Sequence, residues 1–186
     1  GGSHGQLNIT GAIEHSCNSF FYEVGYRLGS DTGIYDSDAG LEKLAYYADL
    51  FGLSETSGIE IAESEPELSD FDAVRSAIGQ GTHNLTTAGL ARYVTTVANS
   101  GTCYKLSLLD KLTDNNGVVL KDYTPEVRNY IDLPGYEWSA IHQGMRRVIE
   151  SKAYYEDMPV NVAGKTGTAQ ENKSRANHAL FVGYAP

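Results

Sequence analysis

The sequence predicts an α+β fold in which helices pack against an antiparallel sheet. Apolar residues recur at helical spacing over most of residues 9–101 and again after Pro134. The period changes to two around Asn116-Gly117 and once more over residues 160–184. Because helices fill the middle and strands close the chain, the pattern favours α+β over an alternating α/β arrangement. The length of 186 residues suffices for one domain with a hydrophobic core.

Three helices are expected in the first part of the sequence. Residues 9–14 form the first, with Asn8 or Thr10 as its N-cap. Residues 18–28 form the second, and a glycine follows its last apolar position. Residues 36–52 give the clearest helical pattern. Its apolar face consists of Leu41, Leu44, Ala45, Ala48 and Phe51.

Two further helices are expected after a short extended piece at residues 58–61. The first of them begins at Thr86 or Thr87 and stops before Gly101. The second begins at Pro134, since proline suits the first turn of a helix. Its apolar face consists of Trp138, Ile141, Met145, Val148 and Ile149.

The strands are expected in two pairs. Residues 105–112 and 118–120 flank the segment 114–117, whose Asn-Gly step tolerates the positive φ of a hairpin turn. Residues 160–169 and 179–184 form a second antiparallel pair around a polar segment. Two strands are too few for a stable sheet. We therefore expect an incomplete sheet, whose missing strands are absent or supplied by another copy of the chain.

Composition excludes several classes of function. The formal net charge of −10 argues against nucleic acid as a partner, because phosphate binding requires a basic surface. No apolar run approaches the length of a membrane span, so we expect this fragment to be soluble. Cys17 and Cys103 are expected to be free thiols, although a pair could form a disulfide. The histidines and cysteines lack zinc-like spacing, so neither a metal nor a cofactor is expected.

The segment Lys165-Thr166-Gly167-Thr168 lies within an apolar strand pattern. A lysine at the edge of a buried strand can serve as a charge or proton donor to a reacting centre. Gly167 lets a substrate backbone lie against the strand like an added partner. Thr166 and Thr168 flank this glycine and place two hydroxyls suited to a carboxylate. A Lys-Thr-Gly triplet alone is more often an ordinary strand end.

Ser16-Cys17-Asn18 supplies the second candidate motif. The hydroxyl of Ser16 can relay a proton, and the amide of Asn18 can hold a peptide bond. Taken alone, a Ser-x-Asn step is more often a helix cap or a turn. Paired with Lys-Thr-Gly in this order, it matches two of three signatures of serine acyl-transfer enzymes that react with penicillin. The third signature, Ser-x-x-Lys, carries the nucleophile and occurs nowhere in this sequence.

The segments around these motifs resemble the transpeptidase domain of class B, high-molecular-weight penicillin-binding proteins. The resemblance covers essentially the whole chain. Its blocks are residues 4–5, 7–8, 12–22, 78–81, 87, 90–91, 98–101, 104–105, 144–148, 163–170 and 178–186. It implies a transpeptidase fold like that of penicillin-binding proteins and serine β-lactamases. The fold would be truncated to a mostly helical subdomain, a hairpin and two strands of an incomplete antiparallel sheet. Residues 1–186 would form one partial domain, truncated at both ends.

The resemblance also implies an activity. The parent protein would be a serine-type D,D-transpeptidase that cross-links peptidoglycan stem peptides and is acylated by β-lactams. It would be anchored at the extracytoplasmic face of the bacterial membrane and would work with other cell-wall synthesis proteins.

Family roles transfer to individual residues. Ser16 would pass protons to the leaving amine, Lys165 would support that proton network, and Asn18 would hold the substrate amide. Thr166 and Thr168 would bind the substrate carboxylate, and the Thr168 N–H would form half of the oxyanion hole. The missing Ser-x-x-Lys implies that this chain alone is inactive. The family's further sheet strands are also missing, which implies that the Lys165 strand is displaced or swapped between copies. Gln80, between two glycines, is expected to hold a loop under the cleft.

Two alternatives stay open at this point. A serine β-lactamase would use the same residues but hydrolyse the acyl-enzyme. A non-catalytic sensor domain would have retained the cleft and lost the nucleophile. Deacylation rate separates the first alternative from a transpeptidase, and the presence of Ser-x-x-Lys in the parent separates the second.

Overall fold

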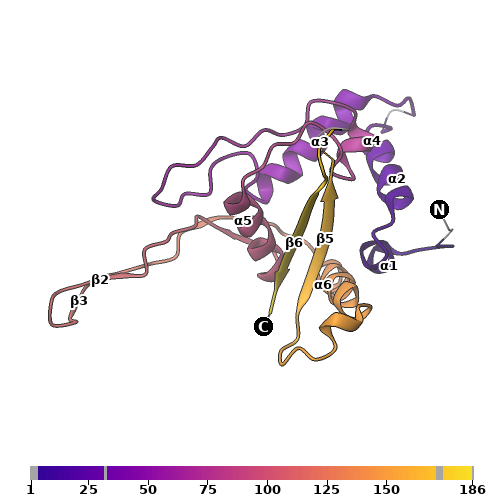
Figure 1. Cartoon of the computed structure of the whole chain (residues 1–186). Helices are drawn as coiled ribbons and strands as arrows, with labels where there is room; N and C mark the ends of the chain where they lie inside the picture. Colours follow the sequence, from indigo (N-terminus) through magenta and orange to yellow (C-terminus); the bar gives the residue numbers. More distant parts are fainter. Residues whose placement is uncertain (1–3, 32, 171–173, 186) are drawn as a thin grey trace.

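The computed structural model describes residues 4–31, 33–170 and 174–185 (Figure 1). Its α-helices are α1 (Ile9–Glu14), α2 (Asn18–Leu28), α3 (Ser37–Leu50), α4 (Ala73–Ser76), α5 (Thr87–Ala98) and α6 (Gly135–Glu150), and the 3₁₀-helix η1 covers Ala153–Tyr155. Its strands are β1 (Thr102–Tyr104), β2 (Lys111–Thr113), β3 (Val119–Asp122), β4 (Val127–Tyr130), β5 (Ala163–Ala169) and β6 (His178–Tyr184). The mixed helix and strand content confirms the predicted α+β class.

The five predicted helices are all present, and side-chain caps mark where three of them begin. The side chain of Asn8 accepts the Gly11 N–H at the start of α1, at 3.0 Å. Asp36 caps α3 and Thr86 caps α5 in the same way. Thr10, the other candidate cap of α1, instead donates its hydroxyl to the carbonyl of Ala140 in α6, at 3.0 Å.

The last two strands form the predicted antiparallel pair. β5 and β6 pair in continuous register from Ala163↔Tyr184 to Ala169↔His178. In Figure 1 they cross the middle of the molecule, with α6 beside β5 and α5 beside β6. Val94, Val97, Met145 and Ala163 are the buried residues of the core that joins these elements. The sheet is therefore two-stranded within the described residues, and its two strands come from one chain.

The middle of the chain differs from expectation in three places. Residues 58–61 belong to no strand: residues 60 and 61 form a bend, and the Glu60 carboxylate accepts the Leu108 N–H at 2.8 Å. The hairpin at 114–117 forms, but its first strand is only β2 instead of the whole segment 105–112. The short helix α4 and the pair β1–β4 were not predicted, since neither is long enough to show a period.

The hairpin β2–β3 projects far from the rest of the molecule (Figure 1). Both cysteines are free, as expected, with Cys103 buried and Cys17 half-buried. No described helix is both long and apolar enough to cross a membrane.

Candidate active site

Ser16 lies in the tight turn that joins α1 to α2. Its φ of +51° is in the left-handed region, which is uncommon for a residue with a Cβ and costs backbone strain. The turn is fixed by its backbone, because the N–H of Ser16 donates to Ile13 and that of Cys17 donates to Ala12. Asn18 follows as the first residue of α2. The strained turn therefore presents Ser16 and Asn18 together at exposed positions.

Helix α1, which precedes this turn, packs directly on α6. The contact is close at Gly144, where a Cβ would lie 2.9 Å from the Cβ of Ile13. The bond from Thr10 to Ala140 ties the same two helices together. Glycine at position 144 thus permits the helix spacing that positions Ser16.

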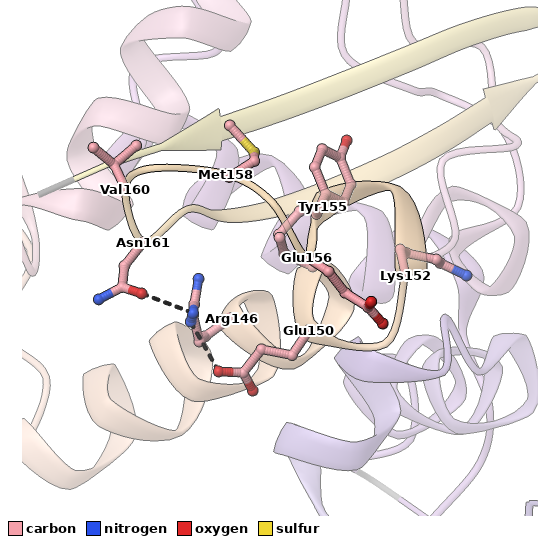
Figure 2. Close-up of a pocket in the computed structure, with 9 residues that line it drawn as sticks. Arg146, Glu150, Lys152, Tyr155, Glu156, Met158, Val160 and Asn161 are labelled. Carbon is pink, nitrogen blue, oxygen red and sulfur yellow. Dashed lines mark hydrogen bonds and ion pairs between the residues drawn. The ribbon is translucent and has the colours of Figure 1, made fainter.

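Arg146 links α6 to the beginning of β5 (Figure 2). Its guanidinium donates to the Val162 carbonyl at 2.8 Å, to the Asn161 side chain at 2.9 Å and to Glu150 at 2.9 Å. Figure 2 shows this arginine between the last turn of α6 and the loop that enters β5. A small cavity of about 250 Å³ lies here, and no predicted site residue lines it. Arg146 therefore holds the start of β5, the strand that carries Lys165, against α6.

Helix α6 therefore brings together two residues that are remote in sequence. The ammonium of Lys165 donates to Ser16 Oγ at 2.9 Å and to the carbonyl of Thr166 at 3.0 Å. Burial lowers the pKa of Lys165, and the positive charge of Lys152 lowers it further. An ammonium with a lowered pKa, hydrogen-bonded to a hydroxyl, is a suitable group for proton exchange.

All six predicted site residues line one open cleft of about 850 Å³. They are Ser16, Asn18, Lys165, Thr166, Gly167 and Thr168. The three residues at 166–168 are exposed, so this part of the strand is accessible to a ligand. A turn residue, the first residue of α2 and one strand thus line the same cavity.

The cleft also contains residues that sequence reasoning did not assign to a ligand. Phe21, Tyr22, Ala77, Ile78, Gln80, Tyr93, Gln170 and Asn177 complete its lining. Burial raises the pKa of Tyr93, so its phenol stays neutral at physiological pH. Phe21 and Tyr22 adjoin the Ser-x-Asn motif, which was the available signal for them. Ile78 and Gln80 belong to the block 78–81, and Gln170 follows the Lys-Thr-Gly motif directly. Ala77, Tyr93 and Asn177 had no such signal, and only the fold places them here.

Among the residues described, no group of three or more His, Cys, Asp or Glu side chains is arranged to hold a metal ion. The chemistry available in the cleft comes from a hydroxyl, an ammonium, two threonine hydroxyls and an amide. This set suits proton transfer beside a bound carboxylate.

The comparisons with known proteins agree with this geometry. The family model for the penicillin binding protein transpeptidase domain matches residues 2–186. Penicillin-binding protein 2B of Streptococcus pneumoniae is 26% identical over 99% of this chain and 31% of its own length. Its solved structure from strain R6 has a TM-score of 0.82 at 23% identity, covering 97% of this chain and 33% of that one.

Two more proteins show the same likeness. The peptidoglycan D,D-transpeptidase MrdA of Haemophilus influenzae is 28% identical over 98% of this chain and 32% of its own length. A ceftriaxone acyl-enzyme complex of penicillin-binding protein A from M. tuberculosis has a TM-score of 0.79 at 20% identity, covering 99% of this chain and 41% of that one. The chain spans about a third of the length of the curated relatives it matches. With the family model matched over almost its full length, the chain belongs to the penicillin-binding-protein transpeptidase family.

Proposed function

We propose that this chain provides the proton-transfer and carboxylate-binding walls of a serine D,D-transpeptidase active site. The observation that carries the proposal is the 2.9 Å hydrogen bond between Lys165 and Ser16, which unites the two sequence motifs in one cleft. The relative MrdA is named a peptidoglycan D,D-transpeptidase, and this name supports the assignment.

The proposed reaction has two acyl-transfer steps. A serine hydroxyl attacks the carbonyl carbon of a stem-peptide amide, forming an ester while the C–N bond breaks and the amine leaves with a proton. The amine of a second stem peptide then attacks this ester, forming a new amide and returning the proton to the serine. Ser16 passes the proton between nucleophile and amine, and Lys165 stabilises the negative charge that develops along this path.

The other site residues hold the substrate. The hydroxyls of Thr166 and Thr168 bind its carboxylate, and the amide of Asn18 binds its peptide group. Gly167 leaves the strand surface open, since an added Cβ would meet only the Cβ of Leu180, at 3.5 Å. The Thr168 N–H stabilises the oxyanion. A β-lactam satisfies the same groups and leaves a stable acyl-enzyme.

The nucleophilic serine is proposed to lie elsewhere in the parent protein. No Ser-x-x-Lys occurs in these 186 residues, and the relatives are about three times as long as the matched part. The isolated chain is therefore proposed to be inactive. The domain assignment of residues 1–186 as a partial transpeptidase domain belongs to the same proposal.

The cellular setting follows from the proposed reaction. The parent would act on peptidoglycan stem peptides at the extracytoplasmic face of the bacterial membrane, anchored there and working with other cell-wall synthesis proteins. The sheet has two strands within the described residues, so its open edges offer sites for strand exchange between fragments. Such strand-swapped oligomers are proposed for the isolated chain only.

The test is incubation of the isolated chain and the complete parent protein with a fluorescent penicillin, followed by intact-mass spectrometry. We expect one stable adduct on the parent and no adduct on the chain. A rapidly hydrolysed adduct on the parent would instead support a β-lactamase. No adduct on either protein would support a sensor domain, and a stoichiometric adduct on the chain would make Ser16 the nucleophile.

A further inference from the structure

Two carbonyl groups of β5 face the cleft, and each accepts a side-chain donor. The ammonium of Lys165 donates to the carbonyl of Thr166 at 3.0 Å, and the amide Nε2 of Gln80 donates to that of Thr168 at 3.4 Å. Backbone carbonyls two residues apart on a strand point to the same edge. Both carbonyls therefore lie on the edge of β5 that faces away from β6. The backbone N–H of Thr168 points the same way, because N–H and C=O of one residue share an edge in an antiparallel strand.

The loop that carries Gln80 is fixed by its backbone. The N–H of Gln80 donates to the Arg75 carbonyl at 3.0 Å, and Gly79 before it has a φ of +76°. Gly81 after it is packed so closely that a Cβ would lie 2.1 Å from the Ser69 hydroxyl and 2.4 Å from that of Ser76. The backbone at position 80 is thus held on both sides, which agrees with the structural role expected from the sequence.

The side chain of Gln80 is less constrained than its backbone. It is half-exposed, it lines the same cleft as Thr168, and its bond to that residue is long for an N–H···O contact. A long bond from a flexible side chain is readily exchanged for a better-placed donor. An extended peptide lying along this edge supplies such a donor, since its backbone N–H groups pair with edge carbonyls.

We propose that Gln80 is a specificity-determining residue that caps the Thr168 carbonyl and is exchanged for an amide N–H of the acyl donor. This inference rests on the proposed function. A ligand with an amide N–H next to its reacting carbonyl replaces the Gln80 bond, so the Thr168 carbonyl exchanges one donor for another. A ligand without that N–H leaves the cap in place and gains nothing at this position. Gln80 thereby reduces the advantage that acyl donors with a peptide-like N–H at this position would otherwise have over those without it.

The test compares two β-lactams on the complete parent protein. A penicillin has an acylamino N–H beside its reacting ring, whereas a carbapenem has a hydroxyethyl group there. Gln80→Met removes the amide donor while retaining the length of the side chain, and Gln80→Ala removes the donor with a different shape. Gln143→Met is the matched control, because Gln143 is an exposed glutamine of α6 outside the cleft.

We expect both Gln80 variants to raise the second-order acylation constant for the penicillin about 2- to 10-fold, the range that one net hydrogen bond represents. The gain should appear in the binding constant, with the limiting acylation rate unchanged. The carbapenem constant and the Gln143→Met protein should match wild type.

An unchanged or lower penicillin constant would overturn the inference, as would an equal gain for both ligands. A lower limiting rate would show that Gln80 positions the strand instead of competing with the ligand. If the penicillin acylates the wild-type protein and the Gln80 variants have the same acylation constant, the result contradicts this inference but not the proposed function. Wild-type protein that neither ligand acylates contradicts the proposed function, and with it this inference.

Discussion

Lys165 Nζ lies 2.9 Å from Ser16 Oγ, although 149 positions separate the two residues in the sequence. Lys165 belongs to β5 and Ser16 to the turn after α1, and α6 contacts both of these elements. The hydrogen bond therefore depends on how α6 packs as well as on the two motifs. This relationship gives four predictions about variants of the chain and its parent.

Replacing Lys165 by methionine should slow penicillin acylation of the parent by about 100-fold or more, the usual contribution of a positioned proton-transfer group. The variant keeps most of the apolar stem and loses the ammonium. Stopped-flow measurement of acylation checks this result. The matched control is Lys121→Met on the projecting hairpin, which should acylate like wild type. A Lys165→Met protein of normal rate would remove this residue from the proposed mechanism.

The same lysine should affect how stability depends on pH. Burial lowers the pKa of Lys165 below its ordinary value of 10.5, so the unfolded chain binds more protons than the folded chain between the two values. Stability therefore rises with pH across that window. Urea unfolding at pH 7 and at a pH inside the window should show a larger gain for wild type than for Lys165→Met. Equal gains in the free energy of unfolding would mean that burial does not lower the pKa of Lys165.

Replacing Ser16 by glycine should separate stability from activity. Glycine adopts a positive φ without strain, so the free energy of unfolding should increase by about 0.5 to 1 kcal/mol. Acylation of the parent should nevertheless fall by about 100-fold, because the hydroxyl is lost. Ser100→Gly is the matched control, since Ser100 has a φ of +52° and is not among the cleft residues. It should gain the same stability and keep normal acylation.

Replacing Gly144 by alanine should disturb the site from a distance. The new Cβ would lie 2.9 Å from that of Ile13 and would push α1 away from α6. Overpacking of this kind costs about 1 to 3 kcal/mol of folding stability. Acylation of the parent should fall as Ser16 moves from Lys165. Gly135→Ala in the same helix meets no atom within 4 Å, so it should not lower stability and should leave acylation unchanged.

Much of the fold was predictable because its signals are local. Caps such as Asn8 and Thr86, and the turn at Gly117, are determined by neighbouring residues, and all three appear as expected. The pair β1–β4 was not predictable, since strands of three and four residues show no clear alternation. The segment 58–61 forms no strand, and its Glu60 carboxylate accepts the N–H of Leu108, a contact that the local pattern does not contain.

The candidate site was predictable as a set of residues but not as a geometry. The motifs identified Ser16 and Lys165, yet no local pattern indicates a left-handed φ at position 16. Gln80 was expected only to hold a loop, because its reach to Thr168 depends on the packing of Gly81 against two serines. Interactions of this kind depend on tertiary contacts between separate elements, which local patterns do not contain.

The most direct test of the central claim is a crystal structure of the complete parent protein acylated by a penicillin. We predict an ester carbonyl oxygen accepting the Thr168 N–H, a carboxylate against the hydroxyls of Thr166 and Thr168, and Ser16 still bonded to Lys165. An acyl group bound away from this cleft would contradict the assignment of these residues to acyl transfer.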